Sequence, residues 1–464
     1  INYKKITLDN GLDVVFHVDK SDPVVAVELM VHVGSAREIE GRTGFAHLFE
    51  HLLFLESENL GKGGLDKMSA RIGGSGANGS TSRDRTNYLQ TVPKDALEKM
   101  IWAEADKLGY FINTVTDPVL AKEKQVVKNE KRQSVDNRPY GHNQYVIGKN
   151  LYPKDHPYNW QVIGSLEDLQ NATLEDVKTF FKKWYVPNNS TLVLSGDIDV
   201  DQATEWVHKY FDEIPKGTEE IPALVKRPGK VDETKSLYYE DNFARVPQLT
   251  MVWPSVPQFH EDSYALDVLA QYLTSGKKAP FNQVLVDDLK LTSNTTMYNY
   301  TSEIAGETQL IIRAFNDIKL DTIKAGVEKA FAKFEAEGIS DKDLNRIKAG
   351  QETNFYQGLS SVLGKGTGLA SYNTYTGNPG FVSEDIKKTL AVTKEDVMNV
   401  YNKYIKNKNY IATSFVPKNQ ADLALTGSVL ADVVEEKIVT GAEESFDPKI
   451  AATYEKTPSS FDRS

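Results

Sequence analysis

The 464-residue chain contains no cysteine, which excludes disulfides, thiolate metal sites, iron–sulfur clusters and a cysteine nucleophile. Any bound metal must therefore take His, Asp or Glu as ligands. Basic residues are also in deficit, with 54 Lys and Arg against 65 Asp and Glu, and the formal charge of −11 argues against nucleic acid or anionic lipid as a partner. No uninterrupted apolar run approaches the roughly 18–20 residues of a membrane helix, so we expect no transmembrane segment.

The start of the chain carries no basic region followed by an apolar stretch, so we expect no signal peptide in this sequence. The first residue is Ile1 rather than Met. A processed product and a trimmed sequence both agree with this start. An exported or periplasmic location is one expectation, and a cytoplasmic location is the alternative.

Strand and helix patterns alternate along the chain. Asn10-Gly11 separates two short apolar segments and predicts a hairpin, and residues 24–33 predict a third strand. Four later segments of the chain show either helical periodicity or apolar residues on nearly every face, and each predicts a helix. This mixture predicts the α+β class. The expected helices span residues 44–55, 95–112, 118–135 and 173–185.

An internal repeat indicates two domains. The segment 173–189 returns at 393–409, an offset of 220, with six identities in seventeen positions, and both copies precede an apolar strand. We therefore predict two similar domains in tandem, each a mostly antiparallel sheet packed with helices. Two amphipathic helices that merely share a capping pattern are the alternative. The predicted domains are residues 1–222 and 223–442, joined through a Pro- and Gly-rich stretch at 215–233, with 443–464 as a tail or a linker to a second half.

The most informative motif lies inside the helix predicted at 44–55. His47 and His51 are four residues apart, so they share one helical face and can hold one metal ion, with Glu50 beside them. These polar groups are costly to bury among the apolar flanking residues unless a divalent cation compensates them. Two core histidines bonded to the backbone, with a separately satisfied Glu, are the alternative.

A hydrolytic zinc site usually has three protein ligands and one open position for water. The helix predicted at 118–135 offers Glu123 and Glu130, which lie two turns apart on one face. One of them can ligate the metal while the other orients a histidine. A solvated helix face is the alternative for both.

These residues resemble the inverted zinc-peptidase motif of the family that contains pitrilysin, insulin-degrading enzyme and mitochondrial processing peptidase. The resemblance extends over most of the chain. It implies that His47, His51 and Glu130 ligate zinc, that Glu50 is the general base, and that Glu123 supports a ligand. Zinc, rather than manganese or cobalt, is the expectation from the family.

The segment Gly74–Gly79 matches G-x-G-x-x-G, but it precedes a strand-like pattern rather than a helix, which argues against a nucleotide site. The family resemblance instead implies an edge strand here that pairs with the substrate backbone, with Asn78 and Gly79 as substrate-binding residues. A simple turn role for Asn78 is the alternative.

The second domain departs from the motif. At the offset of 220, the three motif residues fall opposite Asp267, Ala270 and Gln271, so this domain carries no predicted metal set. Family members also use an Arg and a Tyr from an opposing half, whereas Val286 and Ser293 occupy the matching positions here and no arginine occurs between Arg245 and Arg313.

The resemblance implies a zinc metallo-endopeptidase that acts on peptides or unfolded short polypeptides. This chain would be the zinc-bearing half of a two-half chambered enzyme. A complementary half, fused or separate, would supply the Arg and Tyr. A non-catalytic scaffold or peptide-binding subunit of the same fold is the first alternative, and an unrelated α+β protein with a structural zinc is the second.

Overall fold

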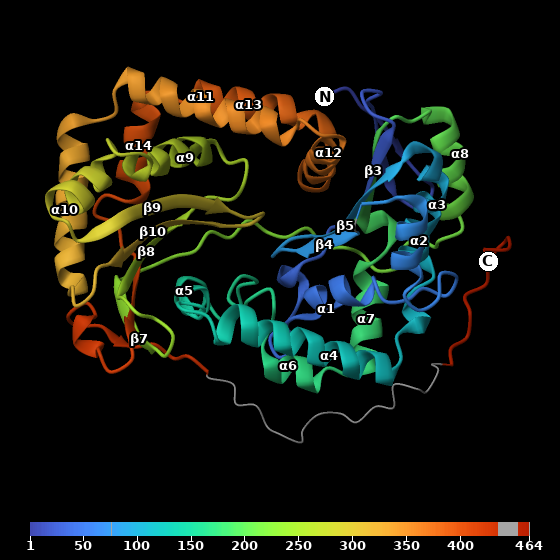
Figure 1. Cartoon of the computed structure of the whole chain (residues 1–464), viewed down its shortest axis with the longest axis horizontal. Helices are drawn as coiled ribbons and strands as arrows, with labels where there is room; N and C mark the ends of the chain where they lie inside the picture. The colour runs from blue at the N-terminus through green and yellow to red at the C-terminus, as the bar shows by residue number, and fades with distance from the viewer. Residues whose placement is uncertain (76, 435–452, 464) are drawn as a thin grey trace.

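The computed structural model of the chain describes residues 1–75, 77–434 and 453–463 and contains two six-stranded sheets (Figure 1). Their strand orders are β1-β2-β6-β3-β5-β4 and β12-β7-β11-β8-β10-β9. Among these strands only the pairs β2–β6, β7–β11 and β7–β12 are parallel, which confirms the predicted α+β class with mostly antiparallel sheets. The first sheet contains β1 (Lys4–Thr7), β2 (Asp13–Val18), β3 (Val24–Val31), β4 (Asn78–Thr81), β5 (Thr86–Pro93) and β6 (Ser190–Gly196); the second contains β7 (Lys235–Asp241), β8 (Gln248–Ser255), β9 (Thr292–Thr301), β10 (Gly306–Ala314), β11 (Ile411–Pro417) and β12 (Val429–Leu430).

Helices cover both sheets, and each sheet has its own apolar core. The helices of the first part are α1 (Phe45–Leu52), α2 (Gly64–Ile72), α3 (Leu97–Gly109), α4 (Asp117–Lys131), α5 (Asn143–Leu151), α6 (Leu166–Asn171), α7 (Leu174–Trp184) and α8 (Val200–Phe211). Those of the second part are α9 (Glu261–Thr274), α10 (Leu320–Glu337), α11 (Asp341–Gly358), α12 (Val362–Thr376), α13 (Val382–Ala391) and α14 (Lys394–Tyr404). Helices α3 and α4 are slightly shorter than the helices predicted at 95–112 and 118–135. A π-helical turn at 132–136 follows directly on α4.

The predicted tandem duplication is confirmed. With the offset of 220, the order β2-β6-β3-β5-β4 corresponds strand by strand to β7-β11-β8-β10-β9. The two repeated segments form α7 and α14, each of which begins at a capping box, Thr173 with Asp176 and Thr393 with Asp396. The two sheets lie on either side of the predicted domain boundary at 222/223, which stays a prediction.

The part of the chain that contains the first sheet is called the first half of the chain below, and the part that contains the second sheet is called the second half. Each of these halves contributes one helix that packs on the sheet of the other. Helix α12 packs on β3 and β6 of the first sheet, where Leu369 and Ala370 join a small buried apolar cluster. Helix α5 packs in turn on β11 of the second sheet through Val146, Ile147 and Leu151. Because α5 and α12 correspond at the offset of 220, the exchange is reciprocal, and it buries the central strands of both sheets on two faces.

The ends of the described chain lie on the first half. Residues 443–452 of the predicted tail lie outside the described residues, whereas residues 453–463 pack against the first half, close to α3 and α8. No helix in the described part of the chain combines the length and the apolar character that crossing a bilayer requires.

Candidate metal centre

Helix α1 separates an apolar face from a polar face. Its buried side chains Leu48, Phe49 and Leu52 belong to the core of the first half. His47 and His51 lie on the other side and keep 12% and 23% of their side-chain surface exposed. The sequence therefore places both imidazoles at the border between core and solvent.

The start of α1 is fixed by a glycine and a buried acid. Gly44 has φ +90°, and a Cβ there would lie 2.8 Å from the carbonyl oxygen of Ile163, so only glycine fits. Glu38 accepts hydrogen bonds from the backbone N–H groups of Gly44 (3.0 Å) and Ala46 (2.9 Å), two of the donors that a helix start leaves unpaired. Burial raises the pKa of Glu38 to about 8, against the effect of these hydrogen bonds.

Both histidines face the same carboxylate of helix α4. Glu130 Oε1 lies 3.7 Å from His47 Nε2, and Glu130 Oε2 lies 3.1 Å from His51 Nε2. One potential ligand atom from each of the three residues lies within 4.8 Å of the others. This convergence of three donors is the arrangement that a single metal ion requires.

The second predicted carboxylate of α4 contacts the opposite nitrogen of His51. Glu123 Oε1 lies 3.1 Å from His51 Nδ1, and Glu123 is buried. Burial lowers the pKa of His51, but the hydrogen bond and charge of Glu123, together with the charge of Glu130, outweigh it and raise this pKa. A proton held on Nδ1 leaves the lone pair of Nε2 directed at Glu130, which suits a ligand.

His47 has a different environment. Burial lowers its pKa and the neighbouring His51 lowers it further, against the charges of Glu130 and Glu50. Its buried Nδ1 has no hydrogen-bond partner among the described residues. Both features favour a neutral imidazole, the form that binds metals.

The donor set fits zinc. Two imidazole nitrogens and one carboxylate oxygen are the ligand types of hydrolytic zinc sites, with bonds of about 2.0–2.2 Å. The three side chains are partly exposed, and one potential ligand atom of each lies within 4.8 Å of the others, so the separations are compatible with a shared ion.

Glu50 lies outside this triad and is held by the edge strand β4. Its Oε2 accepts a hydrogen bond of 2.6 Å from Thr81 Oγ1. At Gly79 a Cβ would lie 3.1 Å from Glu50 Cγ and 3.1 Å from Phe54 Cε2. The strand therefore approaches Glu50 closely because residue 79 has no side chain.

Asn78 is exposed at the start of β4, and its side chain accepts the N–H of Gly79 (2.9 Å). This contact agrees with a turn role and leaves its substrate-binding role a prediction. Because β4 pairs only with β5 among the described strands, its other edge is open.

Among the described residues of the second half, up to residue 434, no comparable set of metal-binding side chains is found. Asp267, opposite His47, is largely buried on α9 and accepts a hydrogen bond from Asn299 (3.4 Å). Tyr298 donates to Gln309 (3.0 Å), and the exposed Tyr300 lies 5.7 Å from the guanidinium of Arg83. Arg83 itself forms a buried ion pair with Glu307 (2.8 Å), so it does not replace the missing arginine.

Sequence reasoning missed Glu38 and Thr81. Both support the motif from outside it, Glu38 through the start of α1 and Thr81 through Glu50. A single acid in a turn and a single threonine in a strand carry no pattern that could have identified them.

Two family models match the chain. The model described as insulinase (peptidase family M16) matches residues 13–152, and the model described as peptidase M16 inactive domain matches residues 171–351. All five residues of the predicted metal centre lie within the first match. The word "inactive" thus applies to a segment that contains none of them.

Individual proteins agree with this result. The chain is 29% identical to zinc protease PqqE of Helicobacter pylori over 408 residues, which cover 87% of this chain and 90% of the relative. It superposes on the crystal structure of a protease from Helicobacter pylori with a TM-score of 0.82 at 26% identity, covering 90% of this chain and 99% of the other. It shares its fold with the periplasmic protease PqqL of Escherichia coli (TM-score 0.74, 19% identity), covering 92% of this chain but 49% of PqqL.

Proposed function

The chain belongs to the insulinase family (peptidase family M16), and from this premise we propose that it is a zinc metallo-endopeptidase that hydrolyses peptides or unfolded short polypeptides. The observation that carries the proposal is the position of Glu50. It stands beside the triad of His47, His51 and Glu130 without belonging to it, and Thr81 holds its carboxylate.

The proposed chemistry divides between the metal and the chain. When bound, zinc acts as a Lewis acid that lowers the pKa of water and polarises a peptide carbonyl. The carboxylate of Glu50 accepts the proton of the attacking water and later delivers it to the departing amine. The hydrogen bond from Thr81 orients this carboxylate, and Glu123 holds the proton on Nδ1 of His51 so that Nε2 remains a ligand.

We propose that the substrate binds as an added strand along the open edge of β4. Backbone pairing of this kind gives affinity that depends little on the substrate's sequence. Asn78 and Gly79 would then contact the substrate beside Glu50, since Gly79 allows a close approach of the two backbones.

We further propose that full activity requires a complementary half. The expected positions of the Arg and Tyr carry Val286 and Ser293, and Arg83, which lies beside Tyr300, is engaged in a buried ion pair with Glu307. The chain's match to about half of PqqL supports an arrangement in which another half supplies the Arg and Tyr. The chain alone should bind zinc but hydrolyse peptides weakly.

The alternative is a non-catalytic scaffold or peptide-binding subunit of the same fold. The match of residues 171–351 to an inactive domain favours a structural role for the second half. A scaffold, however, needs no carboxylate held beside a metal triad, and this argues for catalysis in the first half.

The variant Glu50→Gln distinguishes the two functions. In a fluorogenic peptide assay with zinc-loaded chain, alone and with a purified M16 half that carries the Arg and Tyr, we expect a roughly 10²–10⁴-fold loss of turnover, because the general base is lost. Zinc content should be unchanged. The exposed Glu233→Gln is the matched control and should behave as wild type. Equal turnover of Glu50→Gln and wild type would refute the peptidase proposal.

A further inference from the structure

Residues 453–463, here called the strap, run along the outer side of the first half (Figure 1) and contact the loop that follows the metal-bearing helix α1. The described chain of the second half ends at residue 434, after β12. The strap thus belongs to sequence that follows the second half but contacts the first.

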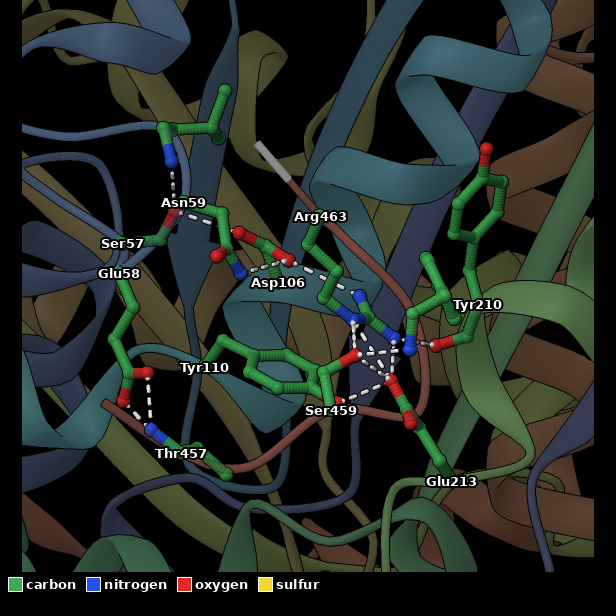
Figure 2. Close-up of polar contacts among 12 residues, drawn as sticks. Ser57, Glu58, Asn59, Asp106, Tyr110, Tyr210, Glu213, Thr457, Ser459 and Arg463 are labelled. Carbon is green, nitrogen blue, oxygen red and sulfur yellow. Dashed lines mark hydrogen bonds and ion pairs between the residues drawn. The ribbon is translucent and has the colours of Figure 1, made fainter.

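The strap inserts an arginine into a buried acidic slot (Figure 2). The side chains of Arg463 and Asp106 are 1% and 0% exposed. Arg463 donates to Asp106 Oδ1 (3.2 Å), to Glu213 Oε1 (2.9 Å) and to the carbonyl oxygen of Tyr210 (2.7 Å). Its guanidinium carbon lies 4.0 Å from the ring centroid of Tyr110. Two carboxylates, a carbonyl and an aromatic face together suit the planar, multiply donating guanidinium of an arginine.

The slot also binds the strap's backbone and hydroxyl groups. Glu213 accepts hydrogen bonds from the N–H of Ser460 (2.7 Å) and the hydroxyl of Ser459 (2.7 Å), as well as from Tyr110 (2.6 Å). These contacts hold the pKa of Glu213 well below its usual range, against the effect of burial. The carboxylate is therefore charged when the strap is docked.

A second set of contacts ties the strap to the loop after α1. Glu58 accepts the N–H of Thr457 (2.6 Å) and its hydroxyl (2.8 Å), and Glu56 accepts the hydroxyl of Tyr454 (3.2 Å). Ser57 and Asn59 of the same loop donate hydrogen bonds to Asp106 (3.0 and 3.2 Å) (Figure 2). Asp106 also accepts a hydrogen bond from Arg463 of the strap. Four consecutive loop residues, 56–59, thus contact either the strap or the carboxylate that the strap neutralises.

We propose that Asp106, Glu213 and Tyr110 form a specific arginine-binding slot for which the strap is an intramolecular peptide ligand, and that its docking orders the loop 56–59 behind the metal-bearing helix. Burial raises the pKa of Asp106 to about 6 even against the charge of Arg463, so without that partner the acid favours its protonated form, which is a weaker acceptor for the hydrogen bonds from Ser57 and Asn59. Loss of the strap therefore removes the groups that Glu56 and Glu58 bind. It also removes the positive charge of Arg463 from Asp106, the carboxylate that anchors the loop. This inference does not depend on the proposed peptidase function.

Hydrogen exchange of the full chain tests the proposal. In Arg463→Ala, we expect the amides of residue 457, of residues 459–463 and of 56–61 to exchange on the order of 100-fold faster than in wild type, since both segments lose their anchor. Lys456→Ala is the matched control: it removes one positive charge from an exposed strap residue and should leave both segments protected.

Rescue in trans separates loss of docking from misfolding. Adding a synthetic peptide of residues 453–463 to Arg463→Ala should restore protection of 56–61, and the same peptide with Ala at its arginine position should not. Unchanged protection in Arg463→Ala would overturn the slot. Fast exchange of 457–463 with normal exchange of 56–61 would overturn the ordering of the loop. Failure of the wild-type peptide to restore protection would overturn the strap as a ligand.

Discussion

Glu123 and Glu130 lie two turns apart on α4, and their surroundings separate their roles. Glu130 keeps 42% of its side chain exposed and faces Nε2 of both histidines, whereas Glu123 keeps 6% and faces only Nδ1 of His51. Periodicity alone left open which acid ligates. The geometry supports Glu130 as the ligand and Glu123 as the residue that orients His51.

Substitution of Glu123 by Gln should weaken zinc binding without abolishing it. The amide oxygen can still accept the Nδ1 proton, but it lacks the charge that strengthens His51 as a donor. We expect a roughly 10-fold or greater loss of zinc affinity in competition with a chromophoric chelator. Glu233→Gln serves as the control, and an unchanged affinity for Glu123→Gln would contradict the assigned role.

Asp267, the counterpart of His47, should make stability depend on pH. Burial raises its pKa to about 7, with a small further rise from the charge of Asp385 and against the hydrogen bond from Asn299. A carboxyl whose pKa is higher in the folded than in the unfolded chain loses its stabilising contribution as pH rises, here between about pH 4 and 7.

Asp267→Asn should therefore be more stable than wild type at pH 8, by about 1–3 kcal/mol, and nearly equal to it at pH 4. Urea unfolding of both chains at the two pH values measures this difference. A gap of the same size at both pH values would show that Asp267 does not titrate in this range.

At the scale of elements, the two capping boxes mark the duplication most clearly. Thr173 and Thr393 each accept an N–H bond of 3.1 Å from the Asp three residues later. Because each bond satisfies an otherwise unpaired donor at a helix start, the two sites should contribute similar stability.

Thr173→Ala and Thr393→Ala should each lower the free energy of unfolding by about 1 kcal/mol. Denaturant unfolding gives the values, and Thr179→Ala, at an exposed position inside α7, should have a much smaller effect. A loss at one cap only would mean that the two helices are not equivalent.

The sequence predicted what depends on neighbours along the chain. The four-residue spacing of His47 and His51, the capping boxes and the strand patterns are local signals. The structure contains the helices and strands in which these signals lie. Glu38, Thr81 and Arg463 could not be predicted, because they act on residues 8, 31 and 357 positions away. Only the folded chain brings these partners together.

At the scale of the whole molecule, the reciprocal exchange of α5 and α12 joins the two halves into one unit. Buried Leu369 of α12 packs against the first sheet, and buried Glu28 of β3 accepts a hydrogen bond from Thr367 of the same helix (2.6 Å). Neither half can therefore bury its own sheet alone. This packing explains how the second half, whose described residues include no metal set, supports the first half.

Leu369→Ala should destabilise both halves together, by about 2–4 kcal/mol, because it leaves a cavity between them. Calorimetry should show a single transition at lower temperature, while Val225→Ala, at a highly exposed position, should leave the transition unchanged. Two separate transitions in the Leu369→Ala variant would contradict a shared core.

The central claim is that one zinc ion binds between α1 and α4, with Glu50 beside it. An anomalous difference map at the zinc absorption edge, from crystals grown with zinc, tests it most directly. The account predicts one peak about 2.0–2.2 Å from His47 Nε2, His51 Nε2 and a carboxylate oxygen of Glu130, with Glu50 not coordinated. A peak elsewhere, or no peak between these side chains, would contradict it.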